Sequence, residues 1–282
     1  MKKIVVTGSS GKAGRTVVRY FLEHGYKVLG VDQTLAANLE LLEFGEHWSA
    51  IRANLTDFSE TLEVLQGADA VVHLANIPAP GLFAPTRTFL ENNAMNYNVF
   101  SAAQTLKLGR VVWASSETTL GLPFETPPRY APVDENHFPI PESSYALSKV
   151  VGEVMAAEFS RWSGIGFVGL RISNIMEAHD YAKFASFQHD PHLRKWNLWG
   201  YVDARDVAQA CWLGLEKPVT GSVNLIIAAS DTVMNRPSSE LMAEVFSGVR
   251  VRANLGEFET LLCIDRAREV LGYEPKYSWR NT

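Results

Sequence analysis

The residues whose types and spacing have the clearest chemical meaning are Tyr145 and Lys149, in the segment Tyr-Ala-Leu-Ser-Lys. Residues four apart on a helix lie on the same face, one turn from each other. A tyrosine with its ordinary pKa of about 10 is a poor base at neutral pH, but a nearby ammonium stabilises the phenolate and lowers that pKa. Such a phenol can accept or return the proton of an alcohol while a hydride moves to or from a nicotinamide. The pair therefore predicts redox chemistry at a carbinol.

A serine, Ser116, is the second candidate, because it follows the apolar segment 110–115, which we expect to be a strand. Ligands of parallel sheets bind outside the carboxyl ends of the strands. A hydroxyl there can hydrogen-bond a substrate oxygen and hold it against Tyr145. Residues 120–144, between the two, are rich in proline, and we interpret them as an irregular active-site loop.

A glycine-rich turn near the N-terminus predicts the cofactor site. It follows a β-branched run over residues 4–7 and precedes an amphipathic segment over 13–24. In a dinucleotide site the first glycine allows a tight turn, the second lets the backbone approach a pyrophosphate, and the third lets the helix pack on the strand. The helix N-terminus adds free N–H donors for the phosphates. The candidate cofactor-binding residues of this turn are Gly8, Ser10, Gly11, Lys12, Ala13 and Gly14.

The choice of dinucleotide depends on Asp32, at the end of an expected strand over residues 26–32. A carboxylate at this position accepts hydrogen bonds from a ribose 2′-OH and repels a 2′-phosphate. No arginine follows it directly. The sequence therefore favours NAD over NADP.

Apolar and amphipathic segments alternate along the chain. We expect further strands at 48–53, 70–75, 165–172 and 223–229, and helices at 58–65, 86–108, 144–163, 203–215, 238–246 and 265–271. This alternation predicts right-handed βαβ units and the α/β fold class, a Rossmann-type doubly wound parallel sheet with helices on both faces. We expect an NAD-binding domain over residues 1–173 that carries the catalytic serine, tyrosine and lysine. A small C-terminal substrate-binding lobe over 174–282 would be interleaved with the last Rossmann elements.

The composition limits the class of partner. The chain has 282 residues, of which 46% are hydrophobic and 20% charged, values typical of a globular protein. A net charge of −5 without a polybasic run argues against nucleic acid and anionic membranes as partners. No apolar stretch approaches the about 18 residues of a membrane span. The two cysteines are far apart, and three histidines between residues 174 and 199 match no standard metal-ligand spacing. We expect a cytoplasmic protein with a small-molecule substrate and no metal.

Together these motifs resemble the extended short-chain dehydrogenase/reductase family, in particular its NAD-dependent sugar epimerase/dehydratase group. The resemblance covers nearly the whole chain. Besides the glycine turn, Asp32 and the Tyr-x-x-x-Lys pair, it rests on His73-Leu74-Ala75, Asn93, Ser115-Ser116, Arg171-x-x-Asn174 and Tyr201-Val202-Asp203-x-x-Asp206-Val207.

The resemblance implies a role for each matching position. Tyr145 would be the acid/base, Ser116 the catalytic serine, and Lys149 would also bind the nicotinamide ribose. Asn93 would anchor its helix beside the lysine. Residues expected to contact the cofactor are Asn54, Leu55, Leu74, Ala75 and Asn76, and those expected to face the substrate are Glu117 and Asn174. Family members often dimerise through the helices that carry Asn93 and Tyr145, so a homodimer is expected.

Two departures from the family pattern bear on the substrate. Dehydratases carry an Asp-Glu pair after the catalytic serine or threonine, whereas Glu117 and Thr118 follow Ser116 here, which argues against dehydration. The stretch between Asn174 and Tyr201 is shorter than the nucleotide-binding region of members that act on nucleotide-sugars. This layout is similar to that of the compact uronate dehydrogenases and indicates a small sugar or sugar acid. Arg194 or Lys195 could then pair with a substrate carboxylate, and the arginine would do so with bidentate geometry.

The sequence leaves alternatives open. Besides an NAD-dependent dehydrogenase, it is compatible with a sugar or nucleotide-sugar epimerase that retains its NAD. A non-catalytic NAD-sensing protein is a further alternative, against which the intact Ser116, Tyr145 and Lys149 argue. Trp196 and Trp199 could stack on a sugar or cover the core. His73 is expected to be a packed residue at a strand end rather than a base.

Overall fold

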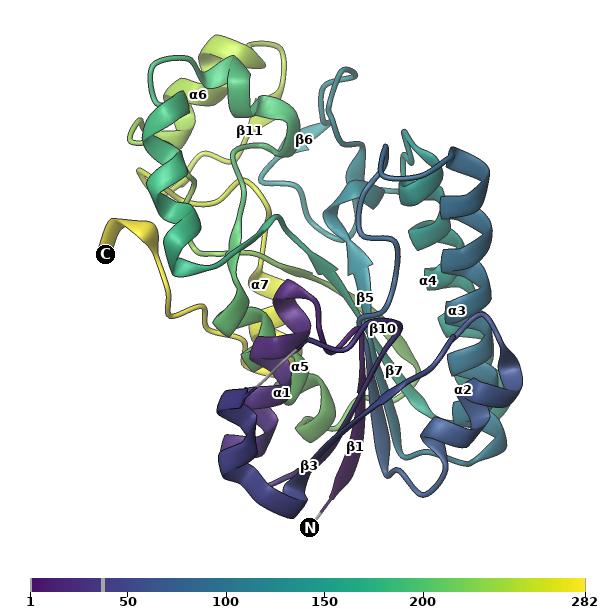
Figure 1. Cartoon of the computed structure of the whole chain (residues 1–282). Coiled ribbons are helices and arrows are strands. Elements are labelled where there is room, and N and C mark those ends of the chain that lie inside the picture. Colours follow the sequence, from purple (N-terminus) through teal and green to yellow (C-terminus); the bar gives the residue numbers. More distant parts are fainter. Residues whose placement is uncertain (1, 37–38, 282) are drawn as a thin grey trace.

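The centre of the molecule is a seven-stranded parallel sheet in the order β10-β7-β5-β4-β1-β2-β3 (Figure 1). The computed structural model describes residues 2–36 and 39–281. The strands are β1 (Lys3–Thr7), β2 (Lys27–Asp32), β3 (Trp48–Arg52), β4 (Ala70–His73), β5 (Arg110–Ser116), β7 (Gly166–Ile172) and β10 (Ser222–Ile227). Strands such as β4 and β7 are buried along their whole length, as expected for apolar strands covered on both faces.

Helices cover both faces of this sheet (Figure 1). On one side lie α1 (Lys12–Glu23), α5 (Ala204–Glu216) and α7 (Asp265–Leu271), and on the other α2 (Phe58–Leu65), α3 (Pro85–Thr105) and α4 (Ser144–Ser163). Each helix buries its apolar residues against the strands, so that one hydrophobic core lies on each side of the sheet. The predicted fold class is confirmed, including the helices on both faces.

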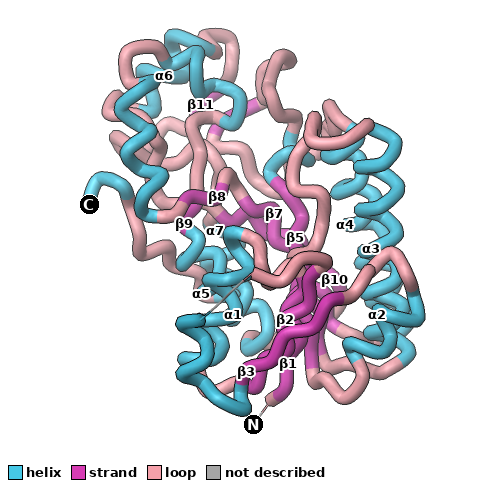
Figure 2. The backbone as a smooth tube through the Cα atoms, in the orientation of Figure 1, coloured by secondary structure: helices cyan, strands magenta, loops and turns pink. Residues whose placement is uncertain are grey.

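Shorter elements gather beyond the carboxyl ends of the strands, where Figure 2 shows them joined by long loops. They include η2 (Glu117–Leu120), β6 (Tyr130–Ala131), β8 (Ile175–Met176), η3 (Ala178–Phe187), η4 (Pro191–Asn197), β9 (Val202–Asp203), α6 (Ser238–Val245), β11 (Arg250–Val251) and η5 (Trp279–Asn281). β6 pairs with β11, and β8 pairs with β9. The proline-rich segment therefore contributes a strand to the C-terminal lobe, whereas β10 and α5, from the C-terminal part of the chain, complete the sheet and one helical layer. A further 3₁₀ segment, η1 (Leu39–His47), lies against β3.

Two predicted elements are shorter by two residues in the structure, for local reasons, and the other elements differ from their predicted lengths by one residue at most. The helix predicted over 86–108 ends at Thr105, because Lys107 takes a positive φ of 54°, a left-handed conformation that a helix does not continue through. The strand predicted over 70–75 ends at His73. Beyond His73, the N–H groups of Leu74 and Ala75 both donate hydrogen bonds to the Thr7 hydroxyl, at 3.2 Å each.

None of the helices in residues 2–36 and 39–281 is both long enough and apolar enough to cross a membrane.

Candidate active site

A cavity of about 1250 Å³ opens at the carboxyl edge of the sheet. It is lined by the turn after β1 and by the loop after β4. These two strands are neighbours in the sheet, and the chain leaves them in opposite directions across it. Ligands of open α/β sheets bind at such a reversal of strand order. We refer to this cavity as the cleft.

The glycine turn borders the cleft in a geometry that needs two of its glycines. Gly8 has a φ of 69°, and a Cβ there would lie 2.7 Å from the Ala75 nitrogen. A Cβ on Gly14 would lie 2.0 Å from the Gly8 carbonyl oxygen. Any larger residue at position 14 would therefore push α1 away from the turn. All six predicted residues of the turn line the cleft.

Asp32 is held at the end of β2 by the turn itself. Its Oδ2 accepts a hydrogen bond from the Ser10 N–H at 3.0 Å, and its Oδ1 accepts one from the Thr34 N–H at 3.3 Å. Leu55, Leu74, Ala75 and Asn76 also line the cleft, as predicted. The Asn76 Oδ1 is buried without a hydrogen-bond partner among the described residues, so it remains an acceptor for a ligand. These residues fit a dinucleotide whose ribose hydroxyls reach Asp32.

The predicted catalytic residues meet at the same edge of the sheet. Ser116 is the last residue of β5, and Ser143 caps α4 by accepting a hydrogen bond from the Ala146 N–H at 3.0 Å. This cap begins the helix so that Tyr145 lies in its first turn, facing the cleft. Lys149, one turn on, is buried beneath: its Nζ donates to the Ala114 carbonyl at 2.8 Å and lies 5.4 Å from the centroid of the Tyr145 ring.

The two adjacent serines of β5 have different partners, because successive strand residues point to opposite faces. Ser115 donates to the Glu153 carboxylate at 2.7 Å, and Glu153 forms a buried ion pair with Arg171 at 2.8 Å. Ser116 accepts hydrogen bonds from the N–H and the hydroxyl of Thr118, at 3.1 and 3.0 Å. The proton of the Ser116 hydroxyl is thereby left to be donated into the cleft.

Burial has the largest effect on both titratable catalytic groups. It raises the pKa of Tyr145 to about 12, with a hydrogen bond to Ser116 acting in the opposite direction. It lowers the pKa of Lys149 to about 7. The spacing of Tyr145 and Lys149 predicts a tyrosine pKa that the lysine lowers. In the structure the pKa is raised instead, because loss of contact with water disfavours the phenolate, as it disfavours the ammonium of Lys149.

Glu117 also lines the cleft and is 3% exposed. Its Oε2 accepts from the Ser173 hydroxyl at 2.6 Å, and its Oε1 accepts from the Asn197 amide at 3.1 Å. Burial raises its pKa to about 7, although these hydrogen bonds and the nearby Arg194 act in the opposite direction. Asn174 also lines the cleft.

Three other predicted site residues are not among those that line the cleft. Asn54 accepts from the N–H and the hydroxyl of Thr56. Asn93 donates to the Phe89 carbonyl of its own helix at 2.8 Å, whereas its neighbour Asn92 reaches α4 through Ser148 at 3.4 Å. The Arg194 Nη2 donates to the Asn174 Oδ1 at 3.2 Å and to the Gly200 carbonyl at 3.1 Å. The roles predicted for these residues stay predictions.

Several lining residues were not singled out from the sequence. They are the loop after β4, residues 77–80, together with Leu122, Pro123 and Glu142. The loop could have been found by the argument used for Ser116, since it too follows the carboxyl end of a parallel strand. Of the two tryptophans, Trp199 is fully buried in the core, whereas Trp196 packs against the core and also lines the cleft.

His73 is a packed strand-end residue, as predicted. Its Nδ1 lies 2.7 Å from the Thr7 hydroxyl and its Nε2 lies 3.1 Å from the Asn96 Oδ1. Burial lowers its pKa to about 3, so the ring is neutral at neutral pH. In the arrangement consistent with these contacts, Nε2–H donates to Asn96 and Nδ1 accepts from Thr7.

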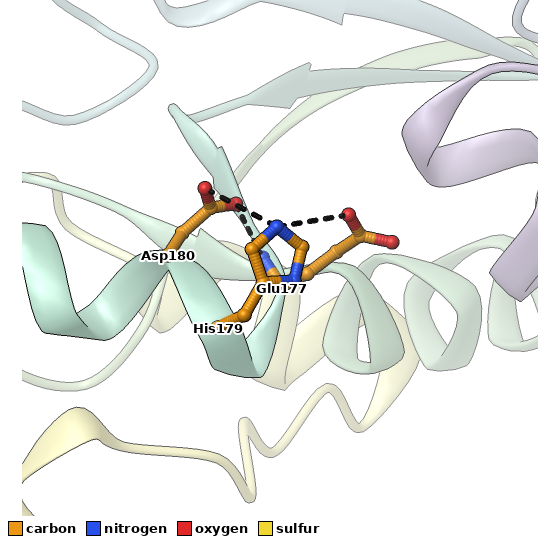
Figure 3. Close-up of side chains that lie close together, drawn as sticks. All are labelled: Glu177, His179 and Asp180. Atoms are coloured by element: carbon orange, nitrogen blue, oxygen red, sulfur yellow. Dashed lines mark hydrogen bonds and ion pairs between the residues drawn. The ribbon is translucent and has the colours of Figure 1, made fainter.

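One group of potential metal ligands consists of Glu177, His179 and Asp180 (Figure 3). The His179 Nε2 lies 3.7 Å from Asp180 and 3.9 Å from Glu177. Cationic side chains already compensate both carboxylates. Asp180 pairs with Lys12 and Lys183 at 2.6 Å each, and Glu177 pairs with Arg15 at 3.3 Å. The group therefore links η3 of the lobe to the start of α1.

Comparison with known proteins agrees with the resemblance noted from the sequence. Residues 4–228 match the NAD dependent epimerase/dehydratase family. The uronate dehydrogenase of Pseudomonas putida is 26% identical over 230 residues, 81% of this chain and 76% of that protein.

Two solved structures show the same fold. A short-chain dehydrogenase/reductase superfamily protein from Agrobacterium tumefaciens, solved with bound NAD, has a TM-score of 0.75, 22% identity, and coverage of 99% of this chain and 94% of that one. The UDP-glucose 4-epimerase of Thermotoga maritima has a TM-score of 0.73, 22% identity, and coverage of 98% and 94%. With the family match over most of its length, the chain belongs to the NAD-dependent epimerase/dehydratase family and is an NAD-dependent enzyme of the extended short-chain dehydrogenase/reductase type.

Proposed function

We propose that this enzyme transfers a hydride between a carbinol of a small sugar or sugar acid and NAD, with Tyr145 as the acid/base. One observation carries the proposal: Ser116, Tyr145 and Lys149 lie close together at the cleft, and the glycine turn borders the same cleft.

In the proposed reaction each residue has a separate task. Bound NAD supplies the hydride acceptor and a positive charge near the reacting carbon. The Ser116 hydroxyl, held by Thr118, donates to the substrate oxygen and orients it. Tyr145 takes the proton of the carbinol. Lys149, fixed by the Ala114 carbonyl, lies close enough to the ring to stabilise the phenolate that precedes this transfer.

The lobe supports a small substrate. The residues between Asn174 and Tyr201 form the short β8, η3 and η4, and η3 is anchored to α1 through Asp180 and Lys12. Because Glu117 and Thr118 follow Ser116, the chain lacks the Asp-Glu pair that family dehydratases carry there. This argues against dehydration and leaves hydride transfer at a carbinol, as in a dehydrogenase or an epimerase.

The test is steady-state formation of NADH by the purified protein with a panel of sugars and sugar acids. Net NADH supports a dehydrogenase. Interconversion of two sugars without net NADH, with NAD retained through purification, supports the epimerase alternative. If no panel member reacts and Tyr145→Phe leaves NAD binding and every cellular effect unchanged, the protein is an NAD sensor and the proposal is wrong.

We also propose that the enzyme is a homodimer through the outer faces of α3 and α4. Leu90 and Tyr97 on α3, and Val154 and Trp162 on α4, are exposed by 52–61%. Large apolar side chains gathered on adjoining helices are typical of a protein interface. Three alanines of these two helices, at positions 102, 103 and 156, are buried in the core and therefore do not belong to this surface.

Two further expectations remain proposals. One is the division into an NAD-binding domain over residues 1–173 and a substrate-binding lobe over 174–282. The other is a cytoplasmic location, supported by two cysteines that form no disulfide with each other.

A further inference from the structure

Two carboxyl side chains line the substrate end of the cleft. Glu117 lines it from the start of η2, and Glu142 lines it from the residue before the cap of α4. Among the described lining residues the one cationic side chain is Lys12, on the glycine turn, and its Nζ is 2.6 Å from Asp180. A substrate beside Tyr145 therefore meets carboxyl groups and no available cation on the cleft wall.

Three cations lie nearby, and each already has a partner: two are buried, and the third, Lys195, is partly exposed. Lys149 is 1% exposed and donates to the Ala114 carbonyl. Arg194 is 6% exposed, donates to Asn174 and Gly200, and places its guanidinium carbon 4.3 Å from the centroid of the Trp196 ring. Lys195, in η4 beside Trp196, pairs with Glu125 at 3.7 Å. Trp196 lines the cleft, whereas Arg194 and Lys195 do not. An anionic group would have to break existing hydrogen bonds or an ion pair to reach any of the three cations, or remain unpaired at a cost in binding free energy.

The same wall suits a neutral polyhydroxylated molecule. A carboxylate only accepts hydrogen bonds, and a sugar hydroxyl can donate one to it. The apolar face of an indole can pack against the C–H groups of a sugar ring while the hydroxyls at the ring edge reach polar partners. Glu142, Trp196 and Asn174 offer these contacts around the position where Ser116 and Tyr145 hold the carbinol.

We propose that the substrate is uncharged, a neutral sugar or polyol, and not a sugar acid, a sugar phosphate or a nucleotide-sugar. This inference rests on the proposed function and narrows its substrate class. It departs from the sequence-based expectation that Arg194 pairs with a substrate carboxylate.

The first test compares matched substrates that differ mainly in charge. NADH formation is measured with D-glucose, D-glucuronate and D-glucose 6-phosphate, with D-galactose and D-galacturonate, and with L-arabinose. We expect kcat/KM for the neutral member of each reactive series to exceed that of its anionic counterpart by at least about tenfold, equivalent to about 1.4 kcal/mol. A kcat/KM for an anionic sugar equal to or above that of its neutral counterpart overturns the inference and leaves the proposed function standing. No turnover of any sugar overturns both.

The second test changes the charge of the wall. Glu142 is exposed, with no side-chain contact needed for folding among those the structure describes, so Glu142→Lys is expected to fold. The variant should shift the ratio of anionic to neutral kcat/KM upward by about tenfold, because it replaces a repulsive charge with an attractive one. Glu142→Gln should give a smaller shift in the same direction.

Glu269→Lys is the matched control. Glu269 is exposed on α7, away from the cleft lining, and the substitution changes the net charge by the same amount. It should leave the ratio unchanged. The inference is overturned if Glu142→Lys folds, as judged by circular dichroism, and its ratio equals that of the wild type or of the control.

Discussion

At the scale of single residues, burial has the largest effect on the pKa values of the ionisable groups around Tyr145. It raises the pKa of Tyr145 and of Glu117 and lowers that of Lys149, so all three groups are biased toward their neutral forms. A bound ligand that excludes further water or adds a charge changes this balance directly. The protonation of these residues is therefore coupled to what occupies the cleft.

Removal of the Tyr145 hydroxyl tests its role as the acid/base. We expect Tyr145→Phe to lower kcat by about 10²–10⁴-fold, the usual contribution of general acid–base catalysis. NAD binding, followed by fluorescence titration, should persist, because the glycine turn is unchanged. Tyr277→Phe, at an exposed tyrosine outside the cleft lining, is the control and should retain activity. A Tyr145→Phe variant with wild-type kcat would rule out this assignment.

Glu117 predicts a pH dependence of stability. Its pKa is about 7 in the folded protein against 4.5 for the free side chain, so the folded state holds a proton that the unfolded state loses between these values. The free energy of unfolding contributed by this group therefore falls as pH rises from about 4.5 to about 7, and the loss persists above that range. In Glu117→Gln this dependence should disappear.

The glutamine is a suitable mimic of the protonated acid, since it can accept from Asn197 and donate to the Ser173 hydroxyl. Urea unfolding at several pH values is the measurement. The variant should gain stability relative to wild type at about pH 8 and show no such gain at about pH 5. Parallel pH curves for the two proteins would show that Glu117 does not titrate as described.

At the scale of elements, α1 can begin against the turn because position 14 lacks a Cβ. Gly14→Ala would bring a methyl group to 2.0 Å from the Gly8 carbonyl, so the turn or the helix must move. We expect the Kd for NAD to rise by at least about tenfold, since a shift of about 1 Å is enough to misplace the phosphate-binding N–H groups.

Isothermal titration with NAD measures this effect. Gly248→Ala is the control, because a Cβ at position 248 would meet nothing within 4 Å. It should leave the Kd unchanged. An unaltered Kd in Gly14→Ala would mean that the turn does not hold the pyrophosphate.

At the scale of the whole molecule, the apolar outer faces of α3 and α4 predict the oligomeric state. The wild type should be a dimer by light scattering, and Val154→Glu should be a monomer, because Val154 is 61% exposed at the centre of the proposed contact. Leu42→Glu replaces a comparably exposed leucine, at 67%, on η1, and should remain dimeric. A monomeric wild type, or a dimeric Val154→Glu protein, would contradict the proposed interface.

The order and type of the elements could be predicted because they depend on local patterns. Apolar runs specify buried strands, and Asp57 and Ser143 begin α2 and α4 by accepting from the N–H three residues on. The ends of elements were less predictable. Strand β4 stops at His73 because Thr7, from another strand, takes the next two N–H groups.

The sequence by itself determined the fold class and predicted the NAD-binding turn and the catalytic serine, tyrosine and lysine. These follow from residue types at short, regular spacings, which act through local backbone geometry. Only the tertiary structure decided which side chains line the cleft and how they ionise. Glu117, for example, is bonded to residues 56 and 80 positions away. Burial and hydrogen bonding depend on such distant segments coming together, and spacing along the chain does not specify them.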